Sequence, residues 1–385
     1  MLPDIAETLG IDFKVLMQHY GSRDVIANRE LGLQYLRFKK NVGKIEHGTV
    51  VFVLDGKKGK SSELVFARGF PKIRRAMLLK PSLEKHFGAR FARVEEKLDG
   101  YNVRTLWVDE KIVCLTRGGV VCPYTTMHVN NALGSKGFFK ENPTLMLCGE
   151  VVGLNNPYQM KSYPEARDFG YFIFDIRDRK TGVAVSVEER EKLLEKYDLP
   201  QVHDFGVFSS KDAKRLLSLV RSLGNEGREG VVLKSDDMKT QVKYTANAST
   251  NTDLSYAFKF CFDYGQAFMF RRLVREAFQA HELGLSGKEL DKEAAELGKA
   301  ILLPMVDTIK RVAAGEEVTE DFEIKVPDED FGKAFVEHLK AMGVKASISA
   351  TSKNKDGSVT LLVKRHYQAT NDKIKAYKKG EFCQD

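Results

Sequence analysis

Lys97 is the residue whose surroundings in this sequence best suit nucleophilic chemistry. It lies in the segment Glu95-Glu96-Lys97-Leu98-Asp99-Gly100, where a β-like run ends in an Asp-Gly pair. A lysine amine attacks phosphorus only in its neutral form, and the free amine has a pKa of roughly 10.4. Burial or cationic neighbours lower that pKa, which is how proteins make lysine a nucleophile. The same segment also fits a surface hairpin turn, so taken alone it leaves both interpretations open.

Further polar motifs follow apolar runs between residues 88 and 246. They are Thr116-Arg117-Gly118-Gly119, Cys148-Gly149-Glu150, Phe172-Ile173-Phe174-Asp175, Glu229-Gly230-Val231-Val232-Leu233-Lys234 and Lys243-Tyr244. Singly, each fits a structural role, because glutamates pair with arginines, phenylalanines fill cores and lysines end strands. Together they supply an amine nucleophile, cations for phosphates, carboxylates for ribose or Mg²⁺, and an aromatic platform for a base. That set is what attack on the α-phosphate of a nucleotide requires.

The charge of the chain favours polyanionic partners. Its formal charge is +8 and its isoelectric point lies near 9.0, which suits nucleic acids and nucleotides, although a basic protein without such a partner has the same composition. Cations gather in Lys57-Lys58-Gly59-Lys60, Lys72-Ile73-Arg74-Arg75, Arg271-Arg272 and residues 373–379. Several such groups could line a groove that follows phosphates without reading bases.

Composition also excludes several classes of protein. No stretch approaches the roughly 20 apolar residues of a membrane span, and the first residues lack the basic and apolar regions of a signal peptide. Five cysteines at irregular spacing argue against a disulfide framework and against a Cys-x-x-Cys zinc site. We therefore expect a cytoplasmic protein without a membrane segment.

Hydrophobic periodicity predicts a fold of the α+β class. Residues 1–40 are expected to be helical, and residues 49–56 and 63–67 to form a hairpin with a turn at Asp55-Gly56. Helices are expected at 188–197 and 211–223. Short strands are expected at 90–97, 102–108, 111–116, 145–152, 171–176 and 230–234. Neither Gly-x-x-x-x-Gly-Lys-Ser/Thr nor Gly-x-Gly-x-x-Gly occurs, so ATP would be bound without a phosphate loop of those kinds.

The second half of the chain is expected to begin with helices. An aromatic-rich helix is predicted at 254–278, and helices at 288–299 and 300–313 that Pro304 breaks or kinks. The aromatic residues fit either an ordinary core or an interface with partner helices. A last α+β module is expected, with Asp328 capping a helix over 328–341 and strands at 346–350 and 358–364.

The ordered motifs resemble those of the covalent nucleotidyltransferases, the superfamily of ATP-dependent ligases and mRNA capping enzymes. Lys97-Leu98-Asp99-Gly100 is similar to their nucleophile motif, and the motifs named above are similar to the others, over about 160 residues. Because a helical segment follows Lys243 instead of a five-stranded barrel, the layout resembles the archaeal homodimeric ATP-dependent RNA ligases. Arg68-Gly69-Phe70-Pro71-Lys72-Ile73 also fits that family.

The resemblance implies four domains: a small N-terminal α+β domain (1–75), a ligase-type nucleotidyltransferase domain of antiparallel sheets and helices (76–247), a helical dimerisation domain (248–316) and a small α+β C-terminal domain (317–385). It implies Lys97 as catalytic residue and Glu150 and Glu229 as ligands of Mg²⁺ or Mn²⁺. The implied nucleotide-binding residues are Glu95, Leu98, Asn102, Arg104, Arg117, Glu150, Phe172, Val231, Lys234 and Lys243. Phe174 is the second choice for stacking on the base, and Lys239 is a further candidate for phosphate contact.

The function that this resemblance implies is that of an ATP-dependent RNA ligase. Lys97 would form lysyl-AMP, AMP would pass to an RNA 5′-phosphate, and a 3′-hydroxyl would displace it; the protein would act as a homodimer. Lys234 and Lys243 could lower the pKa of the nucleophile and neutralise the triphosphate. Two alternatives stay open: a DNA ligase or capping-type guanylyltransferase, and a non-catalytic RNA-binding dimer with a nucleotide pocket.

Overall fold

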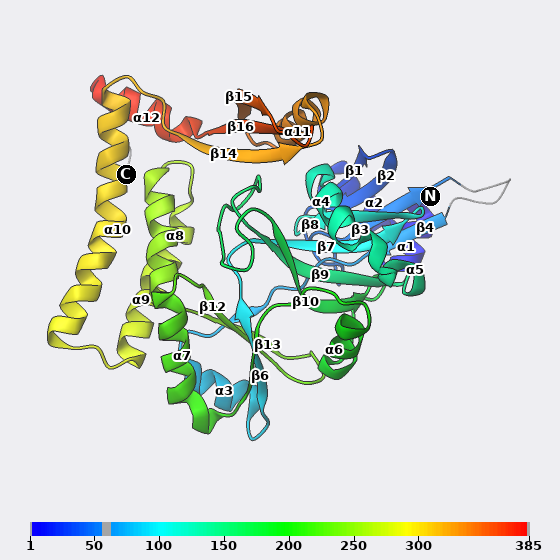
Figure 1. The fold of residues 1–385 in the computed structure, drawn as a ribbon, viewed down its shortest axis with the longest axis horizontal. Helices are drawn as coiled ribbons and strands as arrows, with labels where there is room; N and C mark the ends of the chain where they lie inside the picture. The colour runs from blue at the N-terminus through cyan, green and yellow to red at the C-terminus, as the bar shows by residue number, and fades with distance from the viewer. Residues whose placement is uncertain (1, 56–62, 383–385) are drawn as a thin grey trace. The chain divides into compact units, whose positions relative to one another are not determined.

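The computed structural model describes residues 2–55 and 63–382, so the predicted turn at Gly56 and the cations of residues 57–60 lie outside the described residues. The fold belongs to the α+β class, as predicted, with antiparallel sheets and helices (Figure 1). The chain divides into two compact units. Unit 1 combines Met1–Ile73, Asp99–His203 and Asp236–Lys239, and unit 2 combines Arg74–Leu98, Asp204–Ser235 and Thr240–Asp385. None of the helices in the described part of the chain has both the length and the apolar character needed to span a bilayer.

The N-terminal part of unit 1 is an antiparallel sheet covered by two helices. Helices α1 (Leu2–Leu9) and α2 (Phe13–Gly21) precede strands β1 (Val25–Glu30), β2 (Leu33–Phe38), β3 (Val50–Leu54) and β4 (Glu63–Ala67), which pair in that order. Ile5 and Leu16 of the helices share a core with Leu36 and Phe38 of β2. The opposite face of the sheet, with Leu33 and Tyr35, joins a second core.

The prediction of helix through residue 40 is wrong, because residues 25–38 form the β1–β2 hairpin. Leu31 and Gly32 both have positive φ (52° and 79°) and make the turn between the strands. Both faces of β2 are buried, since Leu33 and Tyr35 enter one core and Leu36 and Phe38 the other. A strand buried on both faces lacks the alternation by which a half-buried strand is recognised.

The second sheet of unit 1 has the strand order β10-β9-β7-β8 and is antiparallel throughout. Its strands are β7 (Tyr101–Val108), β8 (Lys111–Thr116), β9 (Leu145–Val152) and β10 (Gly170–Asp178), all close to their predicted bounds. Helices α4 (Pro123–Leu133), α5 (Phe138–Glu141) and α6 (Val187–Lys196) pack on one face, and the 3-10 turn Gly134–Lys136 joins the first two. The other face packs in part against the N-terminal sheet, through Leu106 and Leu115.

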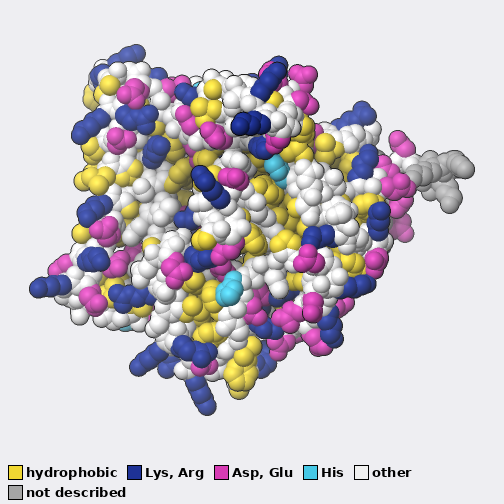
Figure 2. All heavy atoms as spheres, viewed as in Figure 1, with side chains coloured by type: hydrophobic (Ala, Val, Ile, Leu, Met, Phe, Trp, Pro, Cys, Tyr) yellow, Lys and Arg dark blue, Asp and Glu magenta, His cyan; other side chains and the backbone are white. Residues whose placement is uncertain are grey.

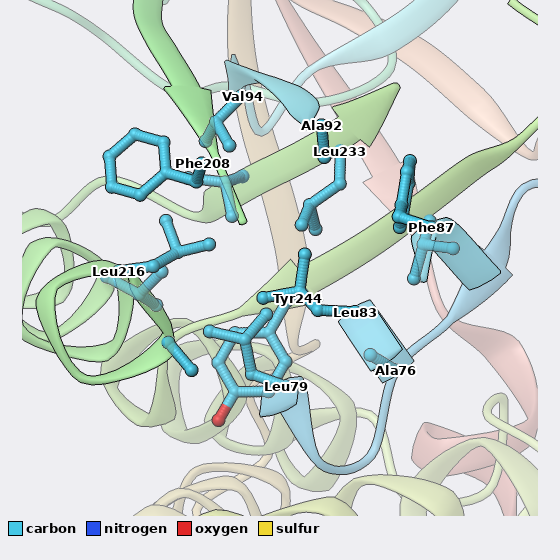
Figure 3. Packing of buried hydrophobic residues seen from close by; sticks show 14 of the residues in the cluster. Ala76, Leu79, Leu83, Phe87, Ala92, Val94, Phe208, Leu216, Leu233 and Tyr244 are labelled. Carbon is cyan, nitrogen blue, oxygen red and sulfur yellow. The ribbon is translucent and has the colours of Figure 1, made fainter. Parts of the chain in front are cut away.

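Unit 2 contains the sheet that carries Lys97. Its strand order is β11-β6-β12-β13-β5, with only the β13–β5 pair parallel. The strands are β5 (Arg74–Arg75), β6 (Ala92–Lys97), β11 (Asp204–Phe208), β12 (Gly230–Lys234) and β13 (Gln241–Thr245). Helices α3 (Leu79–Phe87) and α7 (Ala213–Asn225), the latter preceded by the 3-10 turn Ser210–Asp212, cover one face. Figure 3 shows Leu79, Leu83 and Leu216 of these helices pointing at Leu233 and Tyr244 of the sheet.

The rest of unit 2 is helical and then mixed. Helices α8 (Asn247–Lys259), α9 (Gln266–Glu282) and α10 (Gly287–Ala313) are followed by the sheet β14-β16-β15, with β14 (Thr319–Val326), β15 (Ala346–Lys353) and β16 (Val359–His366). Helices α11 (Glu329–Ala341) and α12 (Gln368–Lys378) complete the chain. Asp328 caps α11 as predicted, since its carboxylate accepts a hydrogen bond from the Phe331 amide at 2.8 Å.

The prediction of one helix over 254–278 is wrong, because the helix is interrupted between Lys259 and Gln266. The helices predicted at 288–299 and 300–313 form one helix, α10, so Pro304 does not break the run. A kink at Pro304 stays a prediction. The core prediction holds for Phe260, which is fully buried and stacks on Tyr367 with ring centroids 3.7 Å apart. Phe270 is exposed, and an interface with partner helices stays a prediction.

The predicted division into four domains stays a prediction. Its first boundary, after residue 75, falls close to the change of unit between Ile73 and Arg74. Residues 76–247, however, contribute strands to both units, because β6, β12 and β13 belong to unit 2 and β7–β10 to unit 1.

A buried carboxyl on α9 makes the stability of unit 2 depend on pH. Burial raises the pKa of Glu276 to about 7, and Glu293 raises it further, whereas Arg275 opposes the shift. The folded protein therefore holds a proton that the unfolded chain has lost between pH 4.5 and 7. Stability falls as the pH rises through this window, and the full penalty is present above it.

We therefore expect Glu276→Gln to stabilise the protein above pH 7 and to change little below pH 4.5. At about 1.4 kcal/mol per unit of pKa, the gain would be at most about 3.5 kcal/mol. Thermal unfolding at pH 4.5 and pH 8 measures it, with the exposed Glu195→Gln as control. An equal effect of Glu276→Gln at both pH values would show that the carboxyl charge is not the cause.

Candidate active site

Strand β6 separates an apolar face from a charged one. Ala92 and Val94 point into the core of unit 2, whereas Arg93, Glu95 and Lys97 alternate with them and lie on the other face. Lys97, the last residue of the strand, is directly opposite Gly230 of β12. The predicted nucleophile is thus held on a regular strand and not on a hairpin turn.

The amine of Lys97 contacts the carboxylate of Glu229. Its Nζ donates a hydrogen bond to Glu229 Oε2 and a longer one, of 3.4 Å, to the Leu98 carbonyl oxygen. The side chain of Lys97 is about one fifth exposed and that of Glu229 about one tenth. Glu229 precedes β12, so the pairing of β6 with β12 creates this contact. The side chain of Leu98 is buried, and its backbone oxygen is the atom that faces the amine.

Two further ion pairs follow on the same face of the strand. Glu95 accepts a hydrogen bond from Lys234 Nζ at 2.5 Å, and both side chains are almost completely buried. Arg93 donates to Asp204 at 2.6 Å. Glu95 and Lys234, both predicted to bind the nucleotide, therefore bind each other in this structure. Removing one partner of such a buried pair costs about 3–5 kcal/mol, because the other charge is left unpaired.

Val231, predicted as a nucleotide contact, does not lie on the face of the sheet that carries Lys97. Val231 is fully buried in the core of unit 2, on the face of β12 opposite to Lys97. Val232 lies directly across from Glu95 and Lys243, on the face that carries Lys97. The side chain available on that face is thus Val232, and Lys243 lies beside it on β13.

In unit 1, three of the predicted residues lie side by side on one rung of the second sheet. Glu150 of β9 pairs with Asn102 of β7 on one side and with Phe172 of β10 on the other. Residues paired across antiparallel strands project to the same face, and all three are partly exposed. This rung offers an amide, a carboxylate and an aromatic ring to a single ligand.

Phe174 and Arg104 follow on this face; Phe174 is partly buried and Arg104 fully buried. Phe174 packs edge-on against Phe70 with ring centroids 5.4 Å apart, so Phe172 remains the residue able to stack on a base. Arg104 is fully buried, which lowers its pKa to about 10.

The prediction of Arg104 as a direct nucleotide ligand does not fit its contacts. Its terminal nitrogens donate to the carbonyl oxygens of Arg68 at 2.5 Å, Gly48 at 2.7 Å and Thr116 at 3.2 Å, and to that of Ala67 at 3.4 Å. The guanidinium therefore ties the N-terminal sheet to the turn after β8. Arg117, in that turn, is exposed.

Metal binding would depend on the nucleotide as well as on the protein. Glu150 and Glu229 offer carboxylate oxygens, the ligands that Mg²⁺ and Mn²⁺ prefer. Within the described residues, no three His, Cys, Asp or Glu side chains gather as they would around a metal ion. A site with one or two carboxylates suits Mg²⁺ held jointly by protein and phosphates.

Sequence reasoning missed the residues that position the segment after Lys97. The hydroxyl of Tyr163 accepts a hydrogen bond from the Asp99 amide at 2.8 Å, and Gln159 donates to the Asp99 carboxylate at 3.2 Å. Gly100 follows, where a Cβ atom would lie 2.1 Å from the Val151 carbonyl oxygen. No local pattern marks Tyr163, because its role depends on a contact across 64 residues.

Comparison with known proteins covers nearly the whole chain. A family model described as RNA ligase matches residues 91–249, and one described as the ligase Pab1020 C-terminal region matches residues 256–381. The uncharacterized protein MJ0414 of Methanocaldococcus jannaschii is 38% identical over 388 residues, which cover 98% of this chain and 96% of that protein.

Solved structures give the same picture. Two forms of an archaeal ATP-dependent RNA ligase superpose with a TM-score of 0.91 at 40% identity, covering 99% of both chains. A putative ATP-dependent DNA ligase from Aquifex aeolicus superposes with a TM-score of 0.87 at 27% identity, covering 97% of this chain and 100% of that one. Both likenesses extend over the nucleotidyltransferase motifs and over the helical second half.

The two phenylalanines of β10 can be separated by experiment. We expect Phe172→Ala to raise the KM for ATP roughly tenfold or more, because a base–aromatic stack contributes about 1–3 kcal/mol. Phe174→Ala should instead lower thermal stability, by roughly 2 kcal/mol or more, because its ring packs against Phe70. Adenylylation kinetics and thermal unfolding of both variants measure this, and the reverse assignment of the two effects would contradict it.

Proposed function

Because this chain belongs to the family of ATP-dependent RNA ligases that includes the archaeal enzymes, we propose that it joins RNA 5′-phosphate and 3′-hydroxyl ends through lysyl-AMP on Lys97. The observation that carries the proposal is the amine of Lys97 at the end of β6 in contact with Glu229. A nucleophilic amine needs a group that holds it and accepts its proton, and Glu229 is the carboxylate in contact.

In the first step, Lys97 Nζ attacks the α-phosphorus of ATP. A phosphorus–nitrogen bond forms, the bond to the β-phosphate oxygen breaks, and pyrophosphate leaves with the electron pair. The proton lost by the amine passes first to Glu229. Phe172 stacks on the adenine, and Glu150 and Asn102 contact the ribose from the same rung.

The cations and the metal ion act on the phosphates. Lys243 lies on the face of the sheet that carries Lys97 and neutralises phosphate charge. When bound, Mg²⁺ or Mn²⁺ would supply positive charge to the triphosphate and the leaving pyrophosphate, with Glu150 and Glu229 as the protein ligands. Lys234 supports this arrangement through Glu95, the partner it already holds.

The two later steps use RNA. An oxygen of the RNA 5′-phosphate attacks the phosphorus of lysyl-AMP, which forms a phosphoanhydride and returns the amine of Lys97. The 3′-hydroxyl of the other end then attacks the 5′-phosphorus, a phosphodiester forms, and AMP leaves. The net reaction consumes one ATP and yields AMP and pyrophosphate for each bond sealed.

The proposed homodimer has support in the helices of unit 2. Phe270 and Phe278 of α9 and Leu302, Leu303 and Ile309 of α10 are exposed large apolar side chains. Apolar side chains gathered on helices are typical of a protein interface. A monomeric mass by light scattering at micromolar concentration would contradict the dimer. The predicted cytoplasmic location stays a prediction.

DNA is the second candidate substrate, because one similar structure is named a putative DNA ligase. An end-joining assay with matched 5′-phosphorylated RNA and DNA strands decides between them. We expect sealed RNA, and sealing of DNA alone would overturn the choice of substrate. A covalent adduct from GTP but not from ATP would indicate a capping-type guanylyltransferase instead.

We predict that Lys97→Ala abolishes the covalent adduct with labelled ATP, because no other amine is held on that strand end. The matched control is Lys85→Ala, an exposed lysine of α3 in the same unit, which should retain wild-type adenylylation. Strand joining by Lys97→Ala at the wild-type rate would exclude Lys97 as the nucleophile. Absence of any adduct in the wild-type protein would favour the non-catalytic RNA-binding dimer.

A second variant tests the role of Glu229. We expect Glu229→Gln to slow adenylylation by about a hundredfold or more, because the amide keeps the shape but accepts no proton. Single-turnover adenylylation over a range of pH measures the effect. A rate within twofold of wild type would show that Glu229 is not the proton acceptor.

A further inference from the structure

A group of cations gathers on unit 1 around the turn that follows β8. Arg104 Nη2 donates to the Gly48 carbonyl at 2.7 Å and to the Thr116 carbonyl at 3.2 Å, so the loop before β3 lies against the turn after β8. At Gly119, which has a φ of +78°, a Cβ atom would stand 2.6 Å from the Gly48 carbonyl oxygen. The two segments are therefore in backbone contact.

Four segments that carry Arg37, His47, Lys72 and Arg117 meet at this place. His47 Nε2 lies 4.0 Å from the point where a Cβ of Gly118 would stand, next to Arg117. Arg37 of β2 lies on the same face as Tyr35, whose hydroxyl accepts a hydrogen bond from the Val121 amide at 3.3 Å. Lys72 follows Gly69, where a Cβ atom would stand 2.3 Å from the His47 carbonyl oxygen.

Cations act on the pKa of His47. That pKa lies below its ordinary value because the ring is partly desolvated and because nearby cations disfavour its charged form. In falling order of effect these cations are Arg117, Arg104, Arg37 and Lys72.

The carboxylates near this group are Glu30, which raises the pKa of Tyr35, and Glu46, which precedes His47. Glu46 is paired with Arg68 at 3.2 Å. Arg37 is half-buried, its Nε is buried without a hydrogen-bond partner, and no carboxylate pairs with its guanidinium in the described part of the chain. Like charges held together repel one another, and partial burial strengthens the repulsion. An anion bound among them would remove this cost.

We propose that Arg37, His47, Lys72 and Arg117 form a binding site for phosphate groups of the RNA strand. The site deepens the proposed function and rests on it. Three cations on three segments match the repeated charges of a strand, and cations of this kind bind phosphates without reading bases. Arg117 is thus reassigned from the nucleotide to the RNA, because Lys243, on the sheet that carries Lys97, faces the phosphates of ATP in the proposed mechanism. On the face shown in Figure 2, basic side chains are interspersed with acidic ones.

The test uses the full-length protein with Lys72→Ala and the double variant Arg37→Met/Lys72→Ala. Lys72 is exposed, so its removal does not endanger folding, and methionine keeps the apolar stem of Arg37. The matched control is Lys14→Ala/Lys111→Ala, two exposed lysines elsewhere in unit 1. Three quantities are measured: adduct formation with labelled ATP, sealing of pre-adenylylated RNA without ATP, and affinity for a 5′-hydroxyl RNA strand as a function of salt.

We expect the double variant to bind RNA about tenfold or more weakly and to lower the salt slope of binding by about 1.4, since each phosphate contact on a single strand contributes about 0.7. Sealing of pre-adenylylated RNA should fall in parallel, whereas the KM for ATP should not rise. An unchanged RNA affinity and salt slope would overturn the proposal. A higher KM for ATP with unchanged RNA affinity would assign the cations to the triphosphate and overturn it as well. Failure of wild-type protein to form the adduct would instead overturn the proposed function.

Discussion

Strand β6 must bury apolar side chains on one face and hold ionisable groups on the other, and the site in unit 2 depends on this. Ala92 and Val94 anchor the strand in the core formed with α3 and α7. The strand can then carry Arg93, Glu95 and Lys97 only if each charge finds a partner, because unpaired charges beside a core are costly. The partners Asp204, Lys234 and Glu229 come from neighbouring parts of the same sheet. Lys97 is thus positioned by its own strand, by its contact with Glu229, and by the ion pairs of Arg93 and Glu95 on the same face of the strand.

In unit 1, two sheets pack together while part of one face of the second sheet stays open. Arg104 joins the two sheets by donating hydrogen bonds to carbonyl oxygens on three segments. Hydrogen bonds from a charged donor are stronger than neutral ones, and burial strengthens them further. The N-terminal sheet consequently covers the face at Arg104 and Phe174, while Glu150 and its neighbours on the rung remain accessible.

Local pattern was sufficient for most of the strands, and those that carry Asn102, Glu150 and Phe172 were predicted within two residues of their bounds. The order of the motifs, and not local pattern, singled out Lys97 and Glu229 as candidates. What the sequence could not supply is register. Val231 and Val232 are indistinguishable in a Gly-Val-Val-Leu-Lys run, and only the pairing of Gly230 with Lys97 decides which of them faces the nucleophile.

Arg104 illustrates the second limit of sequence reasoning. Arg104 lies on a strand beside the motifs, where a cation is expected to bind phosphate. Arg37 is also a cation on a strand, but it lies outside every motif. Their roles are decided by which acceptors the fold brings to them. The fold gives Arg104 a set of carbonyl oxygens, so its charge is used within the protein. Arg37 is half-buried, and the fold gives its Nε no hydrogen-bond acceptor. An anion that binds from outside would supply that acceptor, and so it is the acceptors in the fold, more than the residue type, that separate a structural arginine from a binding one.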